Sequence, residues 1–142
     1  MNSRAKGVRG ELQVAHLFKS FGYPAERGQQ HCGMEGYADV VGVPYIWIEV
    51  KRNENLNVYD AMKQADRDSA GYFKRTGEDL LPVVIHRKNN QTWKCTMRLI
   101  DLLAMCGSVP FSTDVPVDGL VTMEWEEWIQ VYMAYENERS AG

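Results

Sequence analysis

The first strong pattern along the chain is helical and lies between about Lys6 and Phe21. When successive residues are placed about 100° apart, the apolar side chains fill one broad arc made of Val8, Leu12, Val14, Ala15, Leu17, Phe18 and Phe21. Gly22 and then Pro24 end the predicted helix. Glu11 falls inside the apolar arc. Either it has a partner, a proton or a metal there, or the helix is rolled slightly and Glu11 favours its positive N-terminus.

A β-hairpin is predicted after a polar loop over residues 22–36. Its strands are residues 38–41 and 45–51, joined by Gly42-Val43-Pro44. Alternation in the second strand places Ile46, Ile48 and Val50 on one face and Trp47, Glu49 and Lys51 on the other. If Pro44 lies at the apex of a three-residue loop, Asp39 lies directly opposite Glu49.

Helices and strands alternate in the rest of the chain. The pattern predicts a helix capped by Asn57 with Gln64 on its polar side, strands over 81–86 and 92–99, a short helix over 100–105, a loop over 108–118 and a final helix over about 122–137. The order α-β-β-α-β-β-α-α indicates an α/β or α+β sandwich around one mixed sheet. We expect a core over residues 1–107 and a linker with a C-terminal helix over 108–142, within a single domain.

The final helix carries an aromatic stripe. Trp125, Trp128, Ile129 and Tyr132 recur at helical spacing. Such a stripe either docks on the core of its own domain or forms a dimer interface. Both alternatives remain open at this point.

Composition describes an ordinary globular protein, with 142 residues, 44% hydrophobic and 25% charged. No apolar run approaches the roughly 20 residues needed to span a bilayer, so we expect a soluble cytoplasmic protein without a membrane partner. Three cysteines without a C-x-x-C pair suit a reducing compartment. The adjacent His31-Cys32 is weak evidence for zinc.

Net charge is divided unevenly along the chain. Residues 1–100 hold 15 Lys and Arg against 11 Asp and Glu, whereas residues 101–142 hold 1 against 8, so a net +4 is followed by a net −7. A basic body can meet phosphate, while an acidic tail suits solvent or another protein.

The predicted hairpin brings together groups that suit phosphodiester hydrolysis. Opposed residues have Cβ atoms about 5 Å apart, so Asp39 and Glu49 are near enough to share one hard cation such as Mg²⁺. Lys51 lies two residues further on the same face, about 6 to 7 Å along the strand, where an ammonium can steady a hydroxide or a phosphate. The alternative is a solvated face with a weak Glu49 and Lys51 pair.

These motifs resemble a known family. The runs Lys6-Gly7-Val8-Arg9-Gly10-Glu11, Phe21-Gly22-Tyr23-Pro24-Ala25-Glu26-Arg27, Ala38-Asp39-Val40 and Ile48-Glu49-Val50-Lys51-Arg52 resemble the archaeal-type Holliday junction resolvases. The segments that follow, Leu56-Asn57-Val58, Gln64-Ala65, Pro82-Val83-Val84, His86-Arg87 and Trp93, look like phage-borne members of the same PD-(D/E)XK superfamily. The resemblance covers about residues 4 to 100. Ala38 stands where the superfamily has its proline.

What the resemblance implies is a restriction-endonuclease-like core and a homodimer that cuts branched DNA with Mg²⁺ or Mn²⁺, without a nucleotide cofactor. It implies a catalytic set of Glu11, Asp39, Glu49 and Lys51. Gln64 is added to this set because the polar side of the following helix could bring it to a metal-bound water. The resemblance implies metal ligation by Asp39, Glu49, Glu11 and the carbonyl of Val50. It also implies DNA contacts at Lys6, Arg9, Arg27, Arg52 and Arg87.

Other functions remain open. A nuclease of the same chemistry could act on flap, nicked or duplex DNA. A non-catalytic DNA-binding or virion protein could also use this fold. A location in an infected bacterial host is one further expectation of the phage-like motifs. We expect His16 and His86 to be structural, because this chemistry uses carboxylates and lysine.

Overall fold

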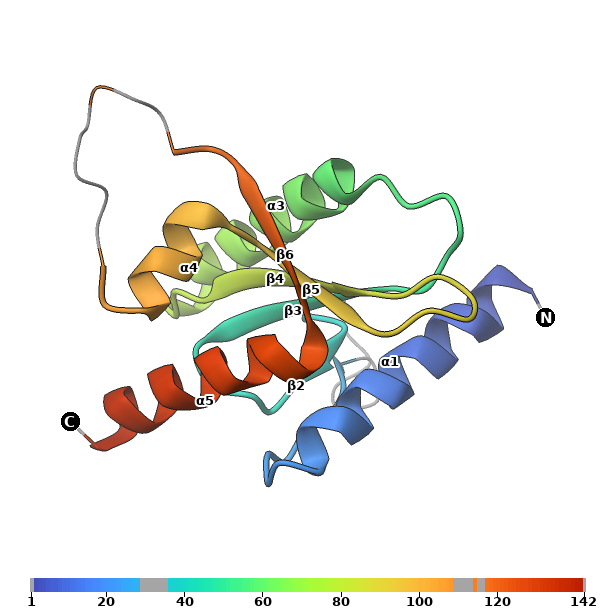
Figure 1. Ribbon diagram of the computed structural model, residues 1–142, viewed down its shortest axis with the longest axis horizontal. Coiled ribbons are helices and arrows are strands. Elements are labelled where there is room, and N and C mark those ends of the chain that lie inside the picture. Colours follow the sequence, from blue (N-terminus) through green and yellow to red (C-terminus); the bar gives the residue numbers. More distant parts are fainter. Residues whose placement is uncertain (1, 29–35, 109–113, 115–116, 142) are drawn as a thin grey trace.

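The computed structural model describes residues 2–28, 36–108, 114 and 117–141 (Figure 1). Its centre is a six-stranded sheet in the order β1-β2-β3-β4-β5-β6. The strands are β1 (Glu26–Arg27), β2 (Val40–Val41), β3 (Ile46–Lys51), β4 (Leu81–His86), β5 (Lys94–Arg98) and β6 (Leu120–Glu124). The helices are α1 (Ser3–Lys19), α3 (Val58–Thr76), α4 (Leu99–Met105) and α5 (Trp125–Ala141). The predicted mixed sheet flanked by helices, with a helix at the C-terminus, is confirmed.

Strand directions follow from the lengths of the connections. Adjacent strands pair antiparallel at every step except between β3 and β4, which are parallel. A parallel pair needs a crossover, and α3 supplies it. The sheet therefore places the C-terminal ends of β3 and β4, at Lys51 and His86, side by side.

Both ends of α3 are fixed by caps that the sequence contains. The side chain of Asn57 accepts hydrogen bonds from the backbone N–H groups of Tyr59 and Asp60, which confirms Asn57 as the N-cap of α3. Gly77, with φ of 77°, ends α3 by donating its N–H to the carbonyl of Phe73. The helix is thus held at both ends by local chemistry.

The sheet separates two apolar clusters. Ile46, Ile48 and Val50 face the larger cluster beneath α1 and α5, whereas Trp47 faces the smaller cluster beneath α3. Figure 1 shows α1 and α5 on one side of the sheet and α3 on the other. The alternation predicted for β3 is confirmed, and it means that Glu49 and Lys51, which share the Trp47 face, point to the α3 side.

The hairpin register is also confirmed. Val40 pairs with Ile48, and the N–H of Asp39 donates to the carbonyl of Ile48 at 3.0 Å. The regular strand β2 is shorter than predicted, beginning at Val40. Gly42 has φ of 89°, and a Cβ there would lie 2.2 Å from the carbonyl oxygen of Pro24, so this turn requires glycine.

Two strands differ from the sequence prediction. Residues 22–36 were expected to be loop, but Glu26–Arg27 form β1 against β2. The final helix was expected to begin near Thr122, but residues 120–124 are β6, paired with β5, and α5 begins at Trp125. Apolar residues spaced three and four apart across this boundary favoured a helix. The strand signal of residues 120–124 was weak because β6 is an edge strand whose residues are only partly buried.

The aromatic stripe of α5 lies in the core of its own chain. Trp128 and Tyr132 are almost fully buried and stack with ring centroids 5.4 Å apart, while Phe18 of α1 meets Trp125 edge to face. The hydroxyl of Tyr132 donates to the carbonyl of Pro44 at 2.7 Å. This is the docking alternative, and it ties α5 to the turn of the hairpin.

No helix in the described part of the chain is long and apolar enough to cross a bilayer.

Candidate functional site

The candidate site is built around two carboxyl groups from neighbouring strands. Glu49 belongs to β3, and Asp39 immediately precedes β2, the antiparallel neighbour of β3. The carboxylate Oδ2 of Asp39 accepts a hydrogen bond of 2.8 Å from the backbone N–H of Val50. This contact fixes Asp39 against β3, where Glu49 projects from the same side of the sheet.

Glu49 is held by a buried aromatic residue. The indole Nε1 of Trp47 donates to Oε1 of Glu49 at 3.1 Å, and only 3% of Glu49 is exposed. The two side chains lie on the same face because they are two residues apart in a strand. Trp47 packs in turn against Tyr72 of α3, with ring centroids 5.4 Å apart. The orientation of Glu49 is therefore set by the packing between β3 and α3.

Burial and mutual repulsion act on both carboxyl groups. Burial, followed by the charge of Asp39, raises the pKa of Glu49 to about 8. Burial also raises the pKa of Asp39, although the hydrogen bond from Val50 and the charge of Lys51 oppose that shift. The two carboxylates repel each other, so a proton or a cation shared between them is favoured. The Asp39 and Glu49 pair therefore favours binding of a proton or a metal cation.

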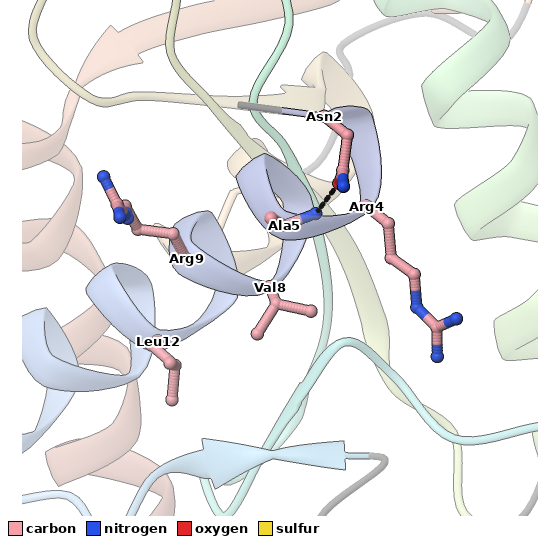
Figure 2. A pocket seen from close by; sticks show the side chains of 6 residues that line it. All are labelled: Asn2, Arg4, Ala5, Val8, Arg9 and Leu12. Carbon is pink, nitrogen blue, oxygen red and sulfur yellow. Dashed lines mark hydrogen bonds between the residues drawn. The ribbon is translucent and has the colours of Figure 1, made fainter.

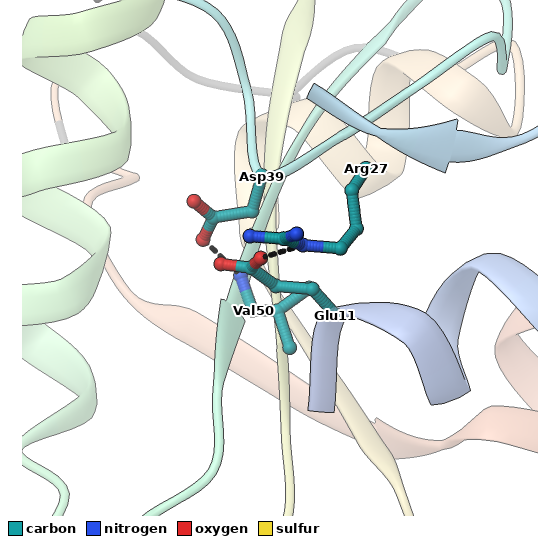
Figure 3. A network of polar contacts seen from close by, with 4 residues as sticks. All are labelled: Glu11, Arg27, Asp39 and Val50. Atoms are coloured by element: carbon teal, nitrogen blue, oxygen red, sulfur yellow. Dashed lines mark hydrogen bonds and ion pairs between the residues drawn. The ribbon is translucent and has the colours of Figure 1, made fainter. Parts of the chain in front are cut away.

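Glu11 approaches the pair from α1. Its Oε2 accepts a hydrogen bond of 2.8 Å from Nε of Arg27 in β1, and the two side chains are only 17% and 13% exposed. Burial is the main cause that raises the pKa of Glu11, and the charge of Asp39 adds to it. Figure 3 shows Glu11 and Arg27 entering beside Asp39 and Val50. The carboxylate that the helical pattern left in an apolar arc therefore has a partner, Arg27.

Lys51 and Gln64 meet across the junction of β3 and α3. The ammonium Nζ of Lys51 donates to Oε1 of Gln64 at 3.1 Å. Both residues line an open hollow of about 350 Å³ between the start of α3 and the segment that follows β3. The favourable charge of Lys51 acts on Glu11, Asp39 and Glu49 alike. The lysine therefore lies where acidic groups and an open space meet.

The donor set fits a hard divalent cation. Carboxylate and carbonyl oxygens are the ligands that Mg²⁺ and Mn²⁺ prefer, and Mg²⁺ keeps several water ligands. Glu49, which is buried, and Asp39, which is half-buried, offer two carboxyl groups whose repulsion such an ion would relieve. Among the described residues, no group of three or more His, Cys, Asp and Glu side chains is gathered as a metal site. Glu11 pairs with Arg27 instead, so its role as a ligand, like that of the Val50 carbonyl, stays a prediction.

Three of the basic residues predicted to bind DNA gather near the first turns of α1. Arg52 follows β3 and donates to Oδ1 of Asn89 at 2.7 Å. Its pKa is lowered, first by burial and then by the charges of Arg87 and Arg9. The guanidinium of Arg87 lies over the ring of Trp93 at 5.5 Å. Cations that repel one another in this way form a surface suited to anions.

Close approach of α1 to the end of β3 creates this cluster. A Cβ on Gly10 would lie 3.0 Å from Cβ of Arg52 and 3.6 Å from the ring of Trp93, so the helix comes near because it carries glycine there. Lys6 is half-buried one turn earlier on the helix. Arg27, the remaining predicted contact, is turned inward to Glu11, so it is not a free cation on the surface.

A shallow hollow of about 490 Å³ runs along the first turns of α1. Figure 2 shows Arg4 and Arg9 extending on either side of the apolar side chains of Val8 and Leu12. The carboxyl groups of the candidate site do not line it. The hollow therefore adds exposed cations near the basic cluster but is not itself the reactive centre.

Sequence reasoning missed two contributors to the site. Trp47 was assigned only to a strand face, although a residue two positions before Glu49 on that face is a natural donor to it. Arg27 was expected to contact DNA, and nothing in its spacing indicated the pairing with Glu11. His31 and Cys32 lie outside the described residues.

Comparisons with known proteins give a structural likeness and no match by sequence. No protein-family model matches the chain, and no curated protein matches it by sequence. Among solved structures, the chain is similar to that of Hjc, a Holliday junction resolvase from the archaeal hyperthermophile Archaeoglobus fulgidus. The two share 16% identity over 87% of this chain and 94% of that chain, with a TM-score of 0.49.

Proposed function

We propose that this protein is a metal-dependent endonuclease that hydrolyses phosphodiester bonds in DNA. The observation that carries the proposal is the pairing of the buried Glu49 with the half-buried Asp39, with Lys51 on the same side of the sheet. Burying two acidic groups together is costly, and a protein that needed only a stable hairpin would gain more from apolar residues there. Pairs of groups whose pKa values are strongly shifted are typical of active sites.

Each residue of the site has a distinct role in this proposal. Asp39 and Glu49 would hold a Mg²⁺ or Mn²⁺ ion, which supplies Lewis acidity and a nucleophilic water when it is bound. Lys51 places an ammonium beside the reacting phosphate, where it stabilises developing negative charge. Gln64 orients that ammonium through its 3.1 Å hydrogen bond. Trp47 keeps Glu49 directed toward Asp39.

The basic residues near α1 would bind the phosphates of the DNA next to the scissile one. Arg9, Arg52 and Arg87 are concentrated in one cluster, and such side chains position a duplex without reading its sequence. Glu11 and Arg27 connect this side of the molecule to the acidic pair. The residues that bind DNA phosphates and the residues that cleave the scissile bond would then be adjacent at the C-terminal end of β3.

Branched DNA, such as a four-way junction, is the substrate that we propose. It is supported by the sequence resemblance of the segments around Glu11, Asp39 and Glu49 to junction resolvases. A symmetrical cut of a junction needs two active sites, so the proposal includes a homodimer. Flap or nicked duplex DNA would be cut by the same groups without that requirement.

Labelled four-way junction, flap, nicked and matched duplex substrates should be incubated with the protein and Mg²⁺ or Mn²⁺. The expected result is cleavage of the junction at paired positions on opposite strands. Glu49→Gln should abolish cleavage and retain DNA binding, while Glu138→Gln on the exposed side of α5 should cut like the wild type. If none of these DNAs is cleaved in a metal-dependent manner, the proposed nuclease activity is refuted. If the flap is cleaved faster than the junction, flap DNA and not the junction is the substrate.

A further inference from the structure

One exposed face of α3 carries cations and an aromatic ring in register. Tyr59, Lys63 and Arg67 are four residues apart, and Lys74 lies seven residues beyond Arg67, so all four share one side of the helix. All are exposed, and Tyr59 is 64% exposed. We call these four residues the α3 basic face. It extends over about 22 Å at 1.5 Å per residue.

Several other cations in the described part of the chain are held by protein groups, whereas those of this face are not. Within the part of the chain that the structure describes, Lys63, Arg67 and Lys74 make no hydrogen bond or ion pair to another side chain. Basic residues elsewhere on α3 and on its neighbouring strands are engaged. Arg75 donates to the carbonyl of Gly36, and Arg98 pairs with Asp66 at 2.7 Å. Like charges four residues apart destabilise a helix, which favours an external anion as their partner.

The α3 basic face borders the candidate site at Arg67. Arg67 lines the same hollow of about 350 Å³ as Lys51 and Gln64. Gln64, which follows Lys63 in the helix, accepts the hydrogen bond from Lys51. Asp60 also lines this hollow and is an acidic residue of the first turn of α3, where it favours the helix N-terminus. A strand leaving the site in this direction would therefore meet Arg67 first.

We infer that the α3 basic face binds an unpaired DNA strand that leaves the candidate active site. Lys63, Arg67 and Lys74 contact its phosphates, and the ring of Tyr59 stacks on one of its bases. Cationic grooves with exposed aromatic rings are the usual platform for single strands. The inference rests on the proposed function in that it takes the ligand of this surface to be DNA. It assigns a surface on the opposite side of the sheet from α1 and its arginine cluster.

Salt dependence of binding tests the phosphate contacts. Fluorescence anisotropy with a labelled single-stranded DNA, in EDTA to prevent cleavage, should be measured from about 50 mM to about 200 mM salt. The variant Lys63→Gln/Arg67→Gln should bind more weakly, and the slope of log affinity against log salt should fall by roughly one per lost contact. The matched control Lys19→Gln/Arg139→Gln removes the same charge from the last turns of α1 and α5 and should keep the wild-type slope.

Stacking is tested separately at Tyr59. Tyr59→Ala should weaken binding of the single strand roughly tenfold, while Tyr59→Phe, which keeps the ring, should bind like the wild type. Neither variant should alter affinity for blunt duplex, because a paired base offers no free face to the ring. Equal losses for alanine and phenylalanine, or equal losses on duplex, would overturn the stacking contact.

The outcomes separate this inference from the proposed nuclease. If the wild type cuts DNA but Lys63→Gln/Arg67→Gln keeps the wild-type salt slope, the α3 basic face is not a DNA surface and the nuclease stands. If Lys63→Gln/Arg67→Gln lowers the salt slope of single-strand binding as expected but the wild type never cuts DNA, the inference stands and the nuclease fails. A slope that falls equally in the control variant would show general electrostatic attraction and overturn the inference.

Discussion

The backbone N–H of Val50 donates a hydrogen bond to Oδ2 of Asp39 at 2.8 Å. This contact joins a main-chain group of β3 to the carboxylate that precedes β2, so the hairpin sets the distance from Asp39 to Glu49. A residue that contributed only its charge would need no such anchor. The strand that presents Glu49 thus also positions the second carboxylate.

Glu49→Gln is expected to stabilise the metal-free protein at alkaline pH. The pKa of Glu49 is raised from its ordinary value of 4.5 to about 8, so the folded chain holds this proton to a higher pH than the unfolded chain. The contribution of the group to stability is therefore complete below pH 4.5 and is lost as pH rises through 8. In EDTA at about pH 9, the variant should melt a few degrees higher, corresponding to about 1–2 kcal/mol.

Thermal melts at several pH values check this expectation. Glu138→Gln, at an exposed position on α5, is the matched control and should follow the wild type at every pH. Addition of Mn²⁺ should raise the melting temperature of the wild type and not that of Glu49→Gln. A Gln variant that is less stable than the wild type in EDTA at alkaline pH would show that Glu49 has another partner.

Gln64→Ala is expected to slow cleavage and leave affinity for Mn²⁺ unchanged. Loss of the 3.1 Å hydrogen bond from Lys51 frees the ammonium to adopt other rotamers, and misplacement of a reacting group reduces kcat more than KM. We expect kcat to fall about tenfold. Gln64→Glu keeps an acceptor oxygen and should restore most of the rate. Equal cleavage rates for the wild type and Gln64→Ala would show that Gln64 does not position Lys51 for catalysis.

Gly28→Ala is expected to disturb the site through the backbone. A Cβ on Gly28 would lie 1.9 Å from the carbonyl oxygen of Ala38, so the end of β1 must move away from β2. Because Arg27 precedes Gly28, this movement also withdraws the guanidinium from Glu11. Urea denaturation should show a loss of about 2 kcal/mol.

The control for Gly28 is Gly7 of α1. A Cβ on Gly7 meets nothing within 4 Å, so Gly7→Ala should add about 0.5–1 kcal/mol through helix propensity. An unchanged stability for Gly28→Ala would mean that β1 is free to shift, and the pairing of Arg27 with Glu11 would then be incidental.

Local chemistry explains why part of the fold could be predicted from the sequence. The strict alternation in β3 and the turn at Gly42 determine the register that brings Asp39 opposite Glu49. Asn57 and Gly77 delimit α3 by capping. Each of these signals involves residues close together in the chain, and such signals are independent of how the sheet is assembled.

The rest depends on contacts between distant segments. β6 is an edge strand of half-buried residues, so its alternation is weak, and the aromatic residues that follow it gave a helical period. β1 has two residues and no apolar side chain. The pairing of Glu11 with Arg27 joins α1 to β1, and only the misplaced carboxylate in the apolar arc indicated that a partner was needed.

His86 is expected to weaken the fold at acid pH. Burial, followed by the charges of Lys94 and Lys88, lowers its pKa from 6.5 to about 4. The unfolded chain therefore takes up this proton first, and the stability due to neutral His86 is complete above pH 6.5 and lost as pH falls to 4. The imidazole Nε2 lies 2.8 Å from Oγ1 of Thr96, a contact that an amide can replace.

Unfolding free energies of the wild type and His86→Gln measure this effect. As pH falls from 6.5 to 4, the wild type should lose about 1–2 kcal/mol more unfolding free energy than His86→Gln. This value allows for partial solvent access to the ring. His16→Gln, at an exposed position of α1, should leave the pH dependence unchanged. A difference that does not vary with pH would mean that His86 titrates normally.

Binding of Mn²⁺ at the acidic pair tests the central claim most directly. Crystals soaked in Mn²⁺ should give an anomalous difference peak in contact with carboxylate oxygens of both Asp39 and Glu49, and crystals of Glu49→Gln should not give it. A wild-type map without such a peak, in which Asp39 stays bound to the N–H of Val50 and Glu49 to Trp47 alone, would contradict the metal site and with it the proposed nuclease.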